Sequence, residues 1–200
     1  MAGSGTAGSP IGVYGAGPLG TLLSMPRQAG VPRHVVVVGL MGSGKTSVGR
    51  RLGKLLGRPW RDSDREIETA TGLTVRELRD RDGVEKMHAL EARQLLDALG
   101  APEPSVISAA ASTIEVPECR AAMTAPDVAV VWLRAQPATL ARRFAAKDQH
   151  RPEFGSSPEV FLAEQAERRN PLFASLDPIV IDVDRIRPNE AAERARQALG

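Results

Sequence analysis

The most informative segment of this 200-residue chain reads Val35-Val36-Val37-Val38-Gly39-Leu40-Met41-Gly42-Ser43-Gly44-Lys45-Thr46. Its valines predict a strand that is buried on both faces, as in parallel sheets. The residues from Gly39 onward match G-x-x-x-x-G-K-[ST] at every fixed position. Where such a loop runs into a helix, backbone N–H groups face phosphate oxygens. The segment therefore predicts a binding site for ATP or GTP.

The residue types in this loop suit contact with a phosphate chain. Gly42 and Gly44 have no Cβ atom, so the backbone around Ser43 can approach a ligand closely. Lys45 can reach the β- and γ-phosphates, and the hydroxyl of Thr46 can bind Mg²⁺. The alternative is a plain glycine turn between a strand and a helix, which leaves Lys45 and Thr46 unexplained.

The overall composition argues against several other kinds of protein. The chain is 42% apolar, enough for a sizeable core, and its 26 Lys and Arg residues nearly balance 24 Asp and Glu residues. A net charge of +2 gives no overall sign of nucleic-acid binding. The single cysteine, Cys119, excludes an intramolecular disulfide and a cysteine zinc site and predicts a buried thiol. No apolar run reaches the roughly 18 residues of a membrane span, so we expect a cytoplasmic protein that contacts no membrane.

The first part of the chain differs from the rest in composition. Residues 1–33 are rich in Gly, Ala, Ser and Pro and show no apolar periodicity, which predicts a disordered extension. The extension lacks the basic and apolar regions of a signal peptide. A second hypothesis is that the protein starts at Met25. Residues 34–200 are predicted to form the folded domain.

Within residues 34–200, short strands alternate with helical patterns. Strands are predicted at 35–38, 59–61, 105–109, 128–133 and 179–182, and helices at 46–56, 64–70, 75–81, 84–99, 137–146, 158–173 and 189–199. This alternation predicts an α/β fold in which helices cover both faces of a parallel sheet, in three αβα layers. Ligands of such sheets bind beyond the carboxyl ends of the strands, so the residues that follow each strand are the candidates for ligand contacts.

Two carboxylates, Asp62 and Asp64, follow the second predicted strand. At positions i and i+2 of an extended segment they point to the same side, toward the phosphate loop. Phosphoryl transfer requires a carboxylate that orients the metal and a group that holds or deprotonates the attacking hydroxyl. Asp62 suits the first role and Asp64 the second. In the alternative, Asp64 only caps a helix that begins at Arg65, and Asp62 is solvated.

Basic residues are concentrated between the fourth predicted strand and the fifth. Arg151 lies in a polar segment with Gly155-Ser156-Ser157, which predicts a mobile loop. An arginine in a loop that closes over the γ-phosphate would stabilise developing charge and exclude water. Most runs of charge are solvated helix faces, and Arg142 and Arg168 can equally be no more than that. The set comprises Arg142, Arg143, Lys147, His150, Arg151, Arg168 and Arg169.

Five segments occur in an order and spacing that resemble the shikimate kinases: GLMGSGKTSVGRRL, DSD, Arg151-Pro152, ERRNPLF and DVDRIRP. The resemblance covers the chain from His34 to the C-terminus. It implies a P-loop NTPase fold with a lid and a five-stranded parallel sheet in the order 2-3-1-4-5. It also implies transfer of phosphate from Mg·ATP to the 3-hydroxyl of shikimate, a step of aromatic amino-acid biosynthesis.

The resemblance assigns roles to the residues of the phosphate-transfer region. Lys45 and Thr46 would handle the phosphates and Mg²⁺, and Asp62 would support the metal. Asp64 would hold the hydroxyl groups of the substrate and act as base. Arg151 would be the lid arginine that contacts the nucleotide.

The resemblance also assigns the two ends of the site. Arg169 would pair with the substrate carboxylate, while Arg143 and Pro188 would enclose the adenine ring. Two departures fall on the acceptor pocket: His88 stands where the family has an arginine, and Ala110-Ala111-Ser112 replaces Gly-Gly-Gly. Imidazole cannot form the bidentate pair that guanidinium forms with a carboxylate. Each alanine adds a Cβ and disfavours the positive φ values that glycine allows.

Three functions remain open from the sequence. The first is an ATP-dependent kinase, acting as a monomer, whose acceptor is shikimate. The second is a kinase of the same fold that acts on another small hydroxylated acid, because His88 and the alanines reshape the pocket. The third is a nucleotide-binding module without transfer activity, which the presence of Asp62, Asp64 and Arg151 disfavours.

Overall fold

Five parallel strands form the central sheet of the computed structural model, which describes residue 1, residues 32–146 without the side chains of 144–146, and residues 157–200. The strands are hydrogen-bonded in the order β2-β3-β1-β4-β5, which confirms the predicted topology. Their bounds are β1 (His34–Val38), β2 (Trp60–Asp62), β3 (Ser105–Ser108), β4 (Val128–Arg134) and β5 (Ile179–Asp182). The predicted extension 1–33 falls almost wholly outside the described residues.

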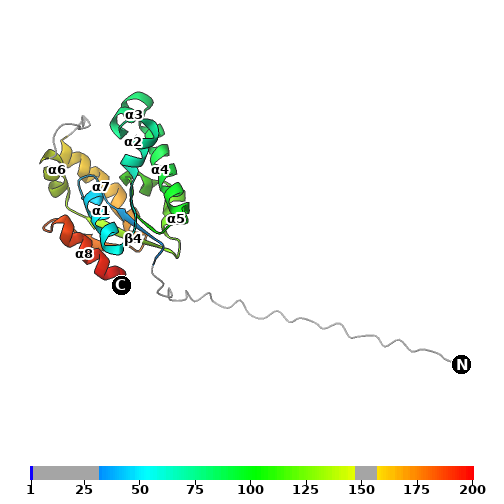
Figure 1. The fold of residues 1–200 in the computed structure, drawn as a ribbon. Coiled ribbons are helices and arrows are strands. Elements are labelled where there is room, and N and C mark those ends of the chain that lie inside the picture. Colours follow the sequence, from blue (N-terminus) through cyan, green and yellow to red (C-terminus); the bar gives the residue numbers. More distant parts are fainter. Residues whose placement is uncertain (2–31, 147–156) are drawn as a thin grey trace.

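Helices cover the sheet, and Figure 1 shows α2 and α3 at the end of the molecule opposite α8. Helix α1 packs against α8, while α4, α5 and α7 each contact a short 3₁₀ helix, η1. The helices are α1 (Lys45–Leu56), α2 (Ser63–Thr71), α3 (Val75–Asp82), α4 (Val84–Gly100), η1 (Ala111–Glu115), α5 (Pro117–Met123), α6 (Pro137–Ala146), α7 (Pro158–Ala174) and α8 (Pro188–Leu199).

The predicted elements match the observed ones to within two residues at each end, but no bounds were predicted for two further helices. The helices η1 and α5 lie between β3 and β4, in a segment where no helix bounds were predicted. Both are too short for a clear 3.6-residue pattern. Helix α5 nevertheless carries a local signal, because Pro117 occupies its first turn.

The predicted core is confirmed in its centre. All residues of β1 are buried, with exposures between 0 and 2%. Cys119 is fully buried on α5, as expected for a small apolar side chain, and burial raises the pKa of its thiol to about 11. Within the part of the chain that the structure describes, we find no helix with the length and hydropathy of a bilayer span.

Helix α1 lies unusually close to the sheet, and this closeness fixes the start of the helix. The Ser108 hydroxyl accepts a hydrogen bond from Trp60 Nε1 (2.9 Å) and donates one to the Lys45 carbonyl (3.1 Å). This arrangement depends on Gly49, because a Cβ there would lie 2.3 Å from Ser108 Oγ. Strands β2 and β3 thus hold the first residue of α1 in place.

Candidate active site

One cavity of about 1220 Å³ brings together almost all the residues that the sequence singled out. They include the phosphate loop, both aspartates and the predicted acceptor residues. Those that line it are Gly42, Ser43, Gly44, Lys45, Thr46, Asp62, Asp64, His88, Ala110, Ala111, Arg143, Arg169 and Pro188. Of the predicted basic residues, Arg168 also lines the cavity and Arg142 does not. Lys147, His150 and the predicted lid arginine Arg151 lie outside the described residues.

The phosphate loop has the backbone conformation that its glycines permit. Gly39, Gly42 and Gly44 have φ values of 143°, 82° and 97°, which side chains rarely adopt. A Cβ on Gly42 would lie 3.1 Å from the Leu140 carbonyl oxygen, whereas Gly44 faces open space. Helix α1 begins directly afterwards at Lys45. The free N–H groups of its first turn therefore lie at the cavity, an arrangement that suits an anion.

Two polar side chains of the loop are arranged for a ligand. Lys45 Nζ donates hydrogen bonds to the carbonyl oxygens of Gly39 (3.0 Å) and Leu40 (3.3 Å), which hold the ammonium against the loop. Burial lowers the pKa of Lys45, and the negative charges of Asp64 and Asp62 oppose this shift. The Ser43 hydroxyl is buried and has no hydrogen-bond partner within the described residues.

The structure corrects the prediction for the two aspartates. Strand β2 extends to Asp62 and α2 begins at Ser63, so Asp64 lies in the first helical turn rather than in an extended segment. The cap of α2 is Asp62, whose Oδ1 accepts a hydrogen bond from the Arg65 amide (3.4 Å). The alternative in which Asp64 caps this helix is therefore wrong. Both carboxylates nevertheless line the cavity.

The environments of these two carboxylates differ. Asp62 is 7% exposed, and its Oδ2 has no partner among the residues that the structure describes. Asp64 is open to the cavity, yet desolvation by the surrounding protein raises its pKa, and the Lys45 ammonium offsets part of this rise. A carboxylate with a raised pKa is a better proton acceptor than an ordinary aspartate.

The predicted adenine end of the cavity lies between α6 and α8. Arg143 donates a hydrogen bond from Nη2 to the Val183 carbonyl oxygen, which holds its guanidinium at the cavity wall. Pro188 occupies the first turn of α8, and Ile186 lies beside it in the lining. A planar guanidinium near apolar side chains suits a flat aromatic ring.

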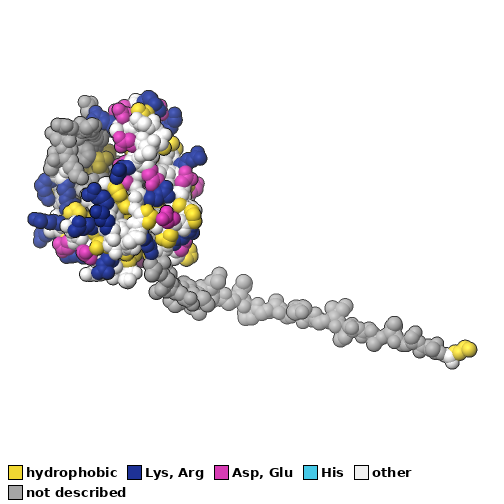
Figure 2. All heavy atoms as spheres, in the orientation of Figure 1, with side chains coloured by type: hydrophobic (Ala, Val, Ile, Leu, Met, Phe, Trp, Pro, Cys, Tyr) yellow, Lys and Arg dark blue, Asp and Glu magenta, His cyan; other side chains and the backbone are white. Residues whose placement is uncertain are grey.

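Positive charge surrounds this end of the molecule. Arg50, Arg51, Lys54 and Arg187 line a second cavity of about 340 Å³ between α1 and the start of α8, and Arg187 also borders the large cavity. Figure 2 shows Lys and Arg side chains gathered on the side of the molecule where Figure 1 places α1 and α8. Such a field attracts a polyphosphate toward the cavity.

The predicted acceptor end contains His88 on α4 and Arg169 on α7. Burial lowers the pKa of His88, and the positive charge of Arg169 lowers it further. The imidazole is therefore neutral near pH 7. Arg169 is the buried cation at this end, with 9% exposure, and it is paired with Glu115.

The alanines after β3 are less disruptive than the sequence suggested. Ala110 has φ −61° and ψ 144°, an ordinary extended conformation, so this backbone does not require glycine. The part of the expectation that remains is crowding, because Ala110 and Ala111 both line the cavity and each has a methyl group that glycine lacks. The next residue, Ser112, donates a hydrogen bond to the Glu91 carboxylate.

Sequence reasoning missed two acidic residues of this region. Glu91 lines the cavity, and burial raises its pKa to about 7. Its position one helical turn after His88 was a usable signal, since residues i and i+3 share a helix face. Glu115 pairs with Arg169, which lies 54 residues later in the sequence. No local sequence pattern predicts a contact between residues so far apart.

Comparisons with known proteins agree with this geometry. A sequence model of the shikimate kinases matches residues 41–200. The shikimate kinase of Caulobacter vibrioides is 39% identical over 142 residues, which span 71% of this chain and 70% of the relative. The shikimate kinase of Mesorhizobium japonicum is 38% identical over 149 residues, 74% of this chain and 72% of the relative.

A solved structure extends the agreement to the fold. Shikimate kinase from Acinetobacter baumannii, determined in complex with shikimate, aligns with a TM-score of 0.77 and 27% identity. The alignment covers 86% of this chain and 94% of the Acinetobacter chain. With the phosphate loop, the sheet order and most of the chain length matched, this protein belongs to the shikimate kinase family.

Proposed function

We propose that this protein transfers the γ-phosphate of ATP to a hydroxyl group of shikimate. The observation that carries the proposal is the content of one cavity, in which a phosphate loop, a carboxylate and a carboxylate-binding arginine meet. Lys45 binds the phosphates, Asp64 binds the attacking hydroxyl, and Arg169 binds the carboxylate of the acceptor. ATP supplies the phosphates for Lys45, and a small hydroxylated carboxylic acid supplies the hydroxyl for Asp64 and the carboxylate for Arg169.

The transfer itself needs one proton acceptor and a positive environment. Asp64 accepts a hydrogen bond from the acceptor hydroxyl and takes its proton as the O–P bond forms. The bond from phosphorus to the β–γ bridging oxygen breaks, and ADP leaves. The Lys45 ammonium and the N–H groups at the start of α1 stabilise negative charge on the phosphates.

The donor set near the loop fits Mg²⁺ that arrives with the nucleotide. Magnesium bound to nucleotides takes one or two protein oxygens and completes its octahedron with phosphate and water. The Thr46 hydroxyl and Asp62 Oδ2, which has no partner among the described residues, would supply such oxygens. No group of three or more His, Cys, Asp or Glu side chains within residues 32–146 and 157–200 could hold a metal ion alone. When bound, the ion neutralises charge on the phosphates.

The acceptor end supports binding of a monoanion. Arg168 and Arg169 contribute two positive charges, Glu115 removes one, and His88 is neutral near pH 7. Arg168, Arg169 and Glu115 thus leave one net positive charge among themselves, which one substrate carboxylate would balance. Nucleoside monophosphates, which are dianionic and carry a base, suit this end poorly.

An assay that couples ADP release to a detectable reaction tests the proposal. Purified protein with Mg·ATP should turn over shikimate, and mass spectrometry should find one phosphate on the product. Asp64→Asn should lower kcat by on the order of a hundredfold or more, whereas Glu68→Gln, one turn later on α2, should not. ATP binding without turnover of shikimate would refute the proposal.

One specific observation favours a second candidate. His88 and the methyl groups of Ala110 and Ala111 alter the acceptor wall relative to the pattern of the family. A kinase of this fold that prefers another small hydroxylated acid would show the same nucleotide site. Turnover of such acids in the same assay, with shikimate inert, would select this candidate.

A further inference from the structure

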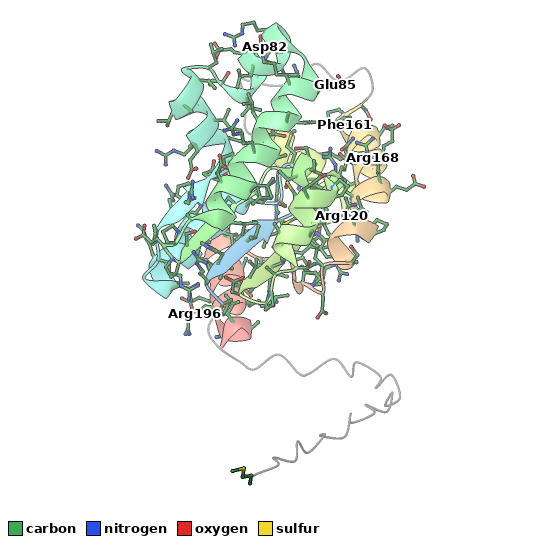
Figure 3. All side chains as sticks on the ribbon, turned by 90° about the vertical axis from the view of Figure 1, so that its right-hand side faces the viewer. Asp82, Glu85, Arg120, Phe161, Arg168 and Arg196 are labelled. Carbon is green, nitrogen blue, oxygen red and sulfur yellow. The ribbon has the colours of Figure 1, made fainter. Side chains whose placement is uncertain are left out.

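A single carboxylate connects two neighbouring arginines of α7 to the end of η1. Glu115 Oε2 accepts hydrogen bonds from Arg169 Nε (3.0 Å) and Nη2 (2.6 Å). Its other oxygen, Oε1, lies 2.6 Å from Arg168 Nε. Figure 3 labels Arg168 on α7, and the contacts of η1 with α5 and α7 place Glu115 near both helices.

The bond to Glu115 leaves one edge of the Arg169 guanidinium available. A guanidinium has two edges that can bind a carboxylate, Nε with Nη2 and Nη1 with Nη2. Glu115 occupies the first edge, and Nη1 has no partner within the described ranges 32–146 and 157–200. Arg169 lines the cavity, whereas Glu115 does not. The Glu115 carboxylate thus binds the edge of the guanidinium that carries Nε, from outside the cavity lining.

This hold matters because the cavity contains competing acids. Glu91 and Asp64 line the same cavity as Arg169, and the charge of Arg169 acts on Glu91. A freed arginine would regain many rotamers and could pair with either acid. It would then be lost to a ligand, and the negative charge near the acceptor hydroxyl would be cancelled.

We propose that Glu115 is the residue that positions Arg169 for the acceptor carboxylate. It fixes the Nε edge of the guanidinium and presents the Nη1 edge to the cavity. It also reduces the charge of the arginine pair to that of a single cation, which matches one carboxylate. This inference rests on the proposed function, because it names the group that orients the anchor of the acceptor.

The test compares three variants by isothermal titration with shikimate and, separately, with Mg·ATP. Glu115→Ala should weaken shikimate binding about tenfold or more, as for loss of a charged hydrogen bond, and leave ATP affinity unchanged. Glu115→Gln should lose less affinity for shikimate, because its amide oxygen can still accept a hydrogen bond from Arg169. Glu118→Ala is the matched control on the first turn of α5, and it should bind like the wild type.

An uncharged ligand separates positioning from general damage. The methyl ester of shikimate has no carboxylate charge, so its affinity should be nearly the same in the wild type and in Glu115→Ala. Equal losses of affinity for shikimate and for its ester in Glu115→Ala would overturn the proposal, since the role of Glu115 would then be merely structural. Unchanged or tighter binding of shikimate by Glu115→Ala would also overturn it, because Glu115 would then compete with the substrate.

A second measurement is independent of the acceptor. NMR of ¹⁵N-labelled protein should show an Arg169 Nε–H signal protected from exchange, assigned by its absence in Arg169→Lys. This protection should be lost in Glu115→Ala and kept in Glu118→Ala. A protected signal in Glu115→Ala would overturn the positioning role. Failure of the wild type to bind shikimate would instead refute the proposed function, and the NMR result would still decide whether Glu115 holds Arg169.

Discussion

The Ser112 hydroxyl donates a hydrogen bond to the buried carboxylate of Glu91. Ser112 occupies the third position of the segment where the resembling family has glycine, so its side chain adds a polar partner beside the acceptor pocket. Burial is the main cause that raises the pKa of Glu91 to about 7, and the bond from Ser112 opposes this rise. Near pH 7 this carboxyl is therefore protonated in about half of the molecules, beside the proposed acceptor pocket.

This proton gives the first prediction, which concerns stability against pH. The pKa of Glu91 is about 7 in the folded protein and near the ordinary 4.5 after unfolding. Between these values the unfolded chain binds fewer protons, so this group makes the free energy of unfolding fall as pH rises, by up to about 3 kcal/mol. Glu91→Gln should lack this fall. Urea unfolding followed by circular dichroism between pH 4.5 and 8 measures it.

Asp97→Asn provides the control, because Asp97 is an exposed acid on the same helix. Its unfolding free energy should follow the pH dependence of the wild type. The prediction is wrong if Glu91→Gln and the wild type show parallel curves over this pH range.

The second prediction concerns the phosphate loop. Lys45→Ala removes the ammonium that lies against the loop and should lower kcat by on the order of a hundredfold or more, because charge on the phosphates is no longer stabilised. Steady-state ADP release measures the loss. Lys86→Ala, an exposed change on α4 outside the cavity, should behave like the wild type. Substantial turnover by folded Lys45→Ala would contradict the assigned role.

The third prediction concerns the close packing of α1 on the sheet. Gly49→Ala places a Cβ 2.3 Å from Ser108 Oγ and 2.9 Å from Trp60 Nε1, so the helix must shift. We expect a loss of about 1–3 kcal/mol in unfolding free energy and a lower kcat, because the start of α1 moves with the helix. Thermal and urea unfolding test this.

Gly100→Ala is the matched substitution, since a Cβ at this position in α4 meets no atom within 4 Å. It should be neutral or stabilising by about 0.5–1 kcal/mol. Equal effects of the two substitutions would show that helix propensity, and not contact with the sheet, governs Gly49.

The fourth prediction concerns the acceptor wall. Replacing His88 by Arg, together with Ala110→Gly and Ala111→Gly, restores a guanidinium and removes two methyl groups from the cavity. The KM for shikimate should fall about tenfold, the gain expected from one charged hydrogen bond, while the KM for ATP stays constant. Steady-state kinetics with each substrate varied provide the test, and an unchanged or higher KM for shikimate would contradict this account of the pocket.

The parts of the fold that the sequence predicted well are those governed by local patterns. The valines of β1 and the glycines of the phosphate loop dictate burial and turn geometry within a few residues of chain. Helix boundaries followed from apolar periodicity, and the sheet order followed from the resemblance to a family. The short helices η1 and α5 contain too few turns to show a period, so their bounds were not predicted.

The parts that the sequence could not supply depend on contacts between distant residues. Glu115 lies 54 residues before Arg169, and only the packing of η1 against α7 brings them together. The start of α2 shows a different limit, because the predicted end of the strand and start of the helix were each displaced by one residue. One additional strand residue turns Asp62 into the helix cap and moves Asp64 into the first turn, which is a difference that pattern reading cannot resolve.

The hydrogen-bonded connection from Trp60 through Ser108 to the Lys45 carbonyl has a practical consequence. The chain has two tryptophans, and the other, Trp132, is fixed in the core with its ring centroid 5.7 Å from that of Phe173. Trp60 is thus the indole coupled to the nucleotide-binding helix. We therefore expect its native fluorescence to change when a ligand binds, which would make occupancy measurable without an attached dye.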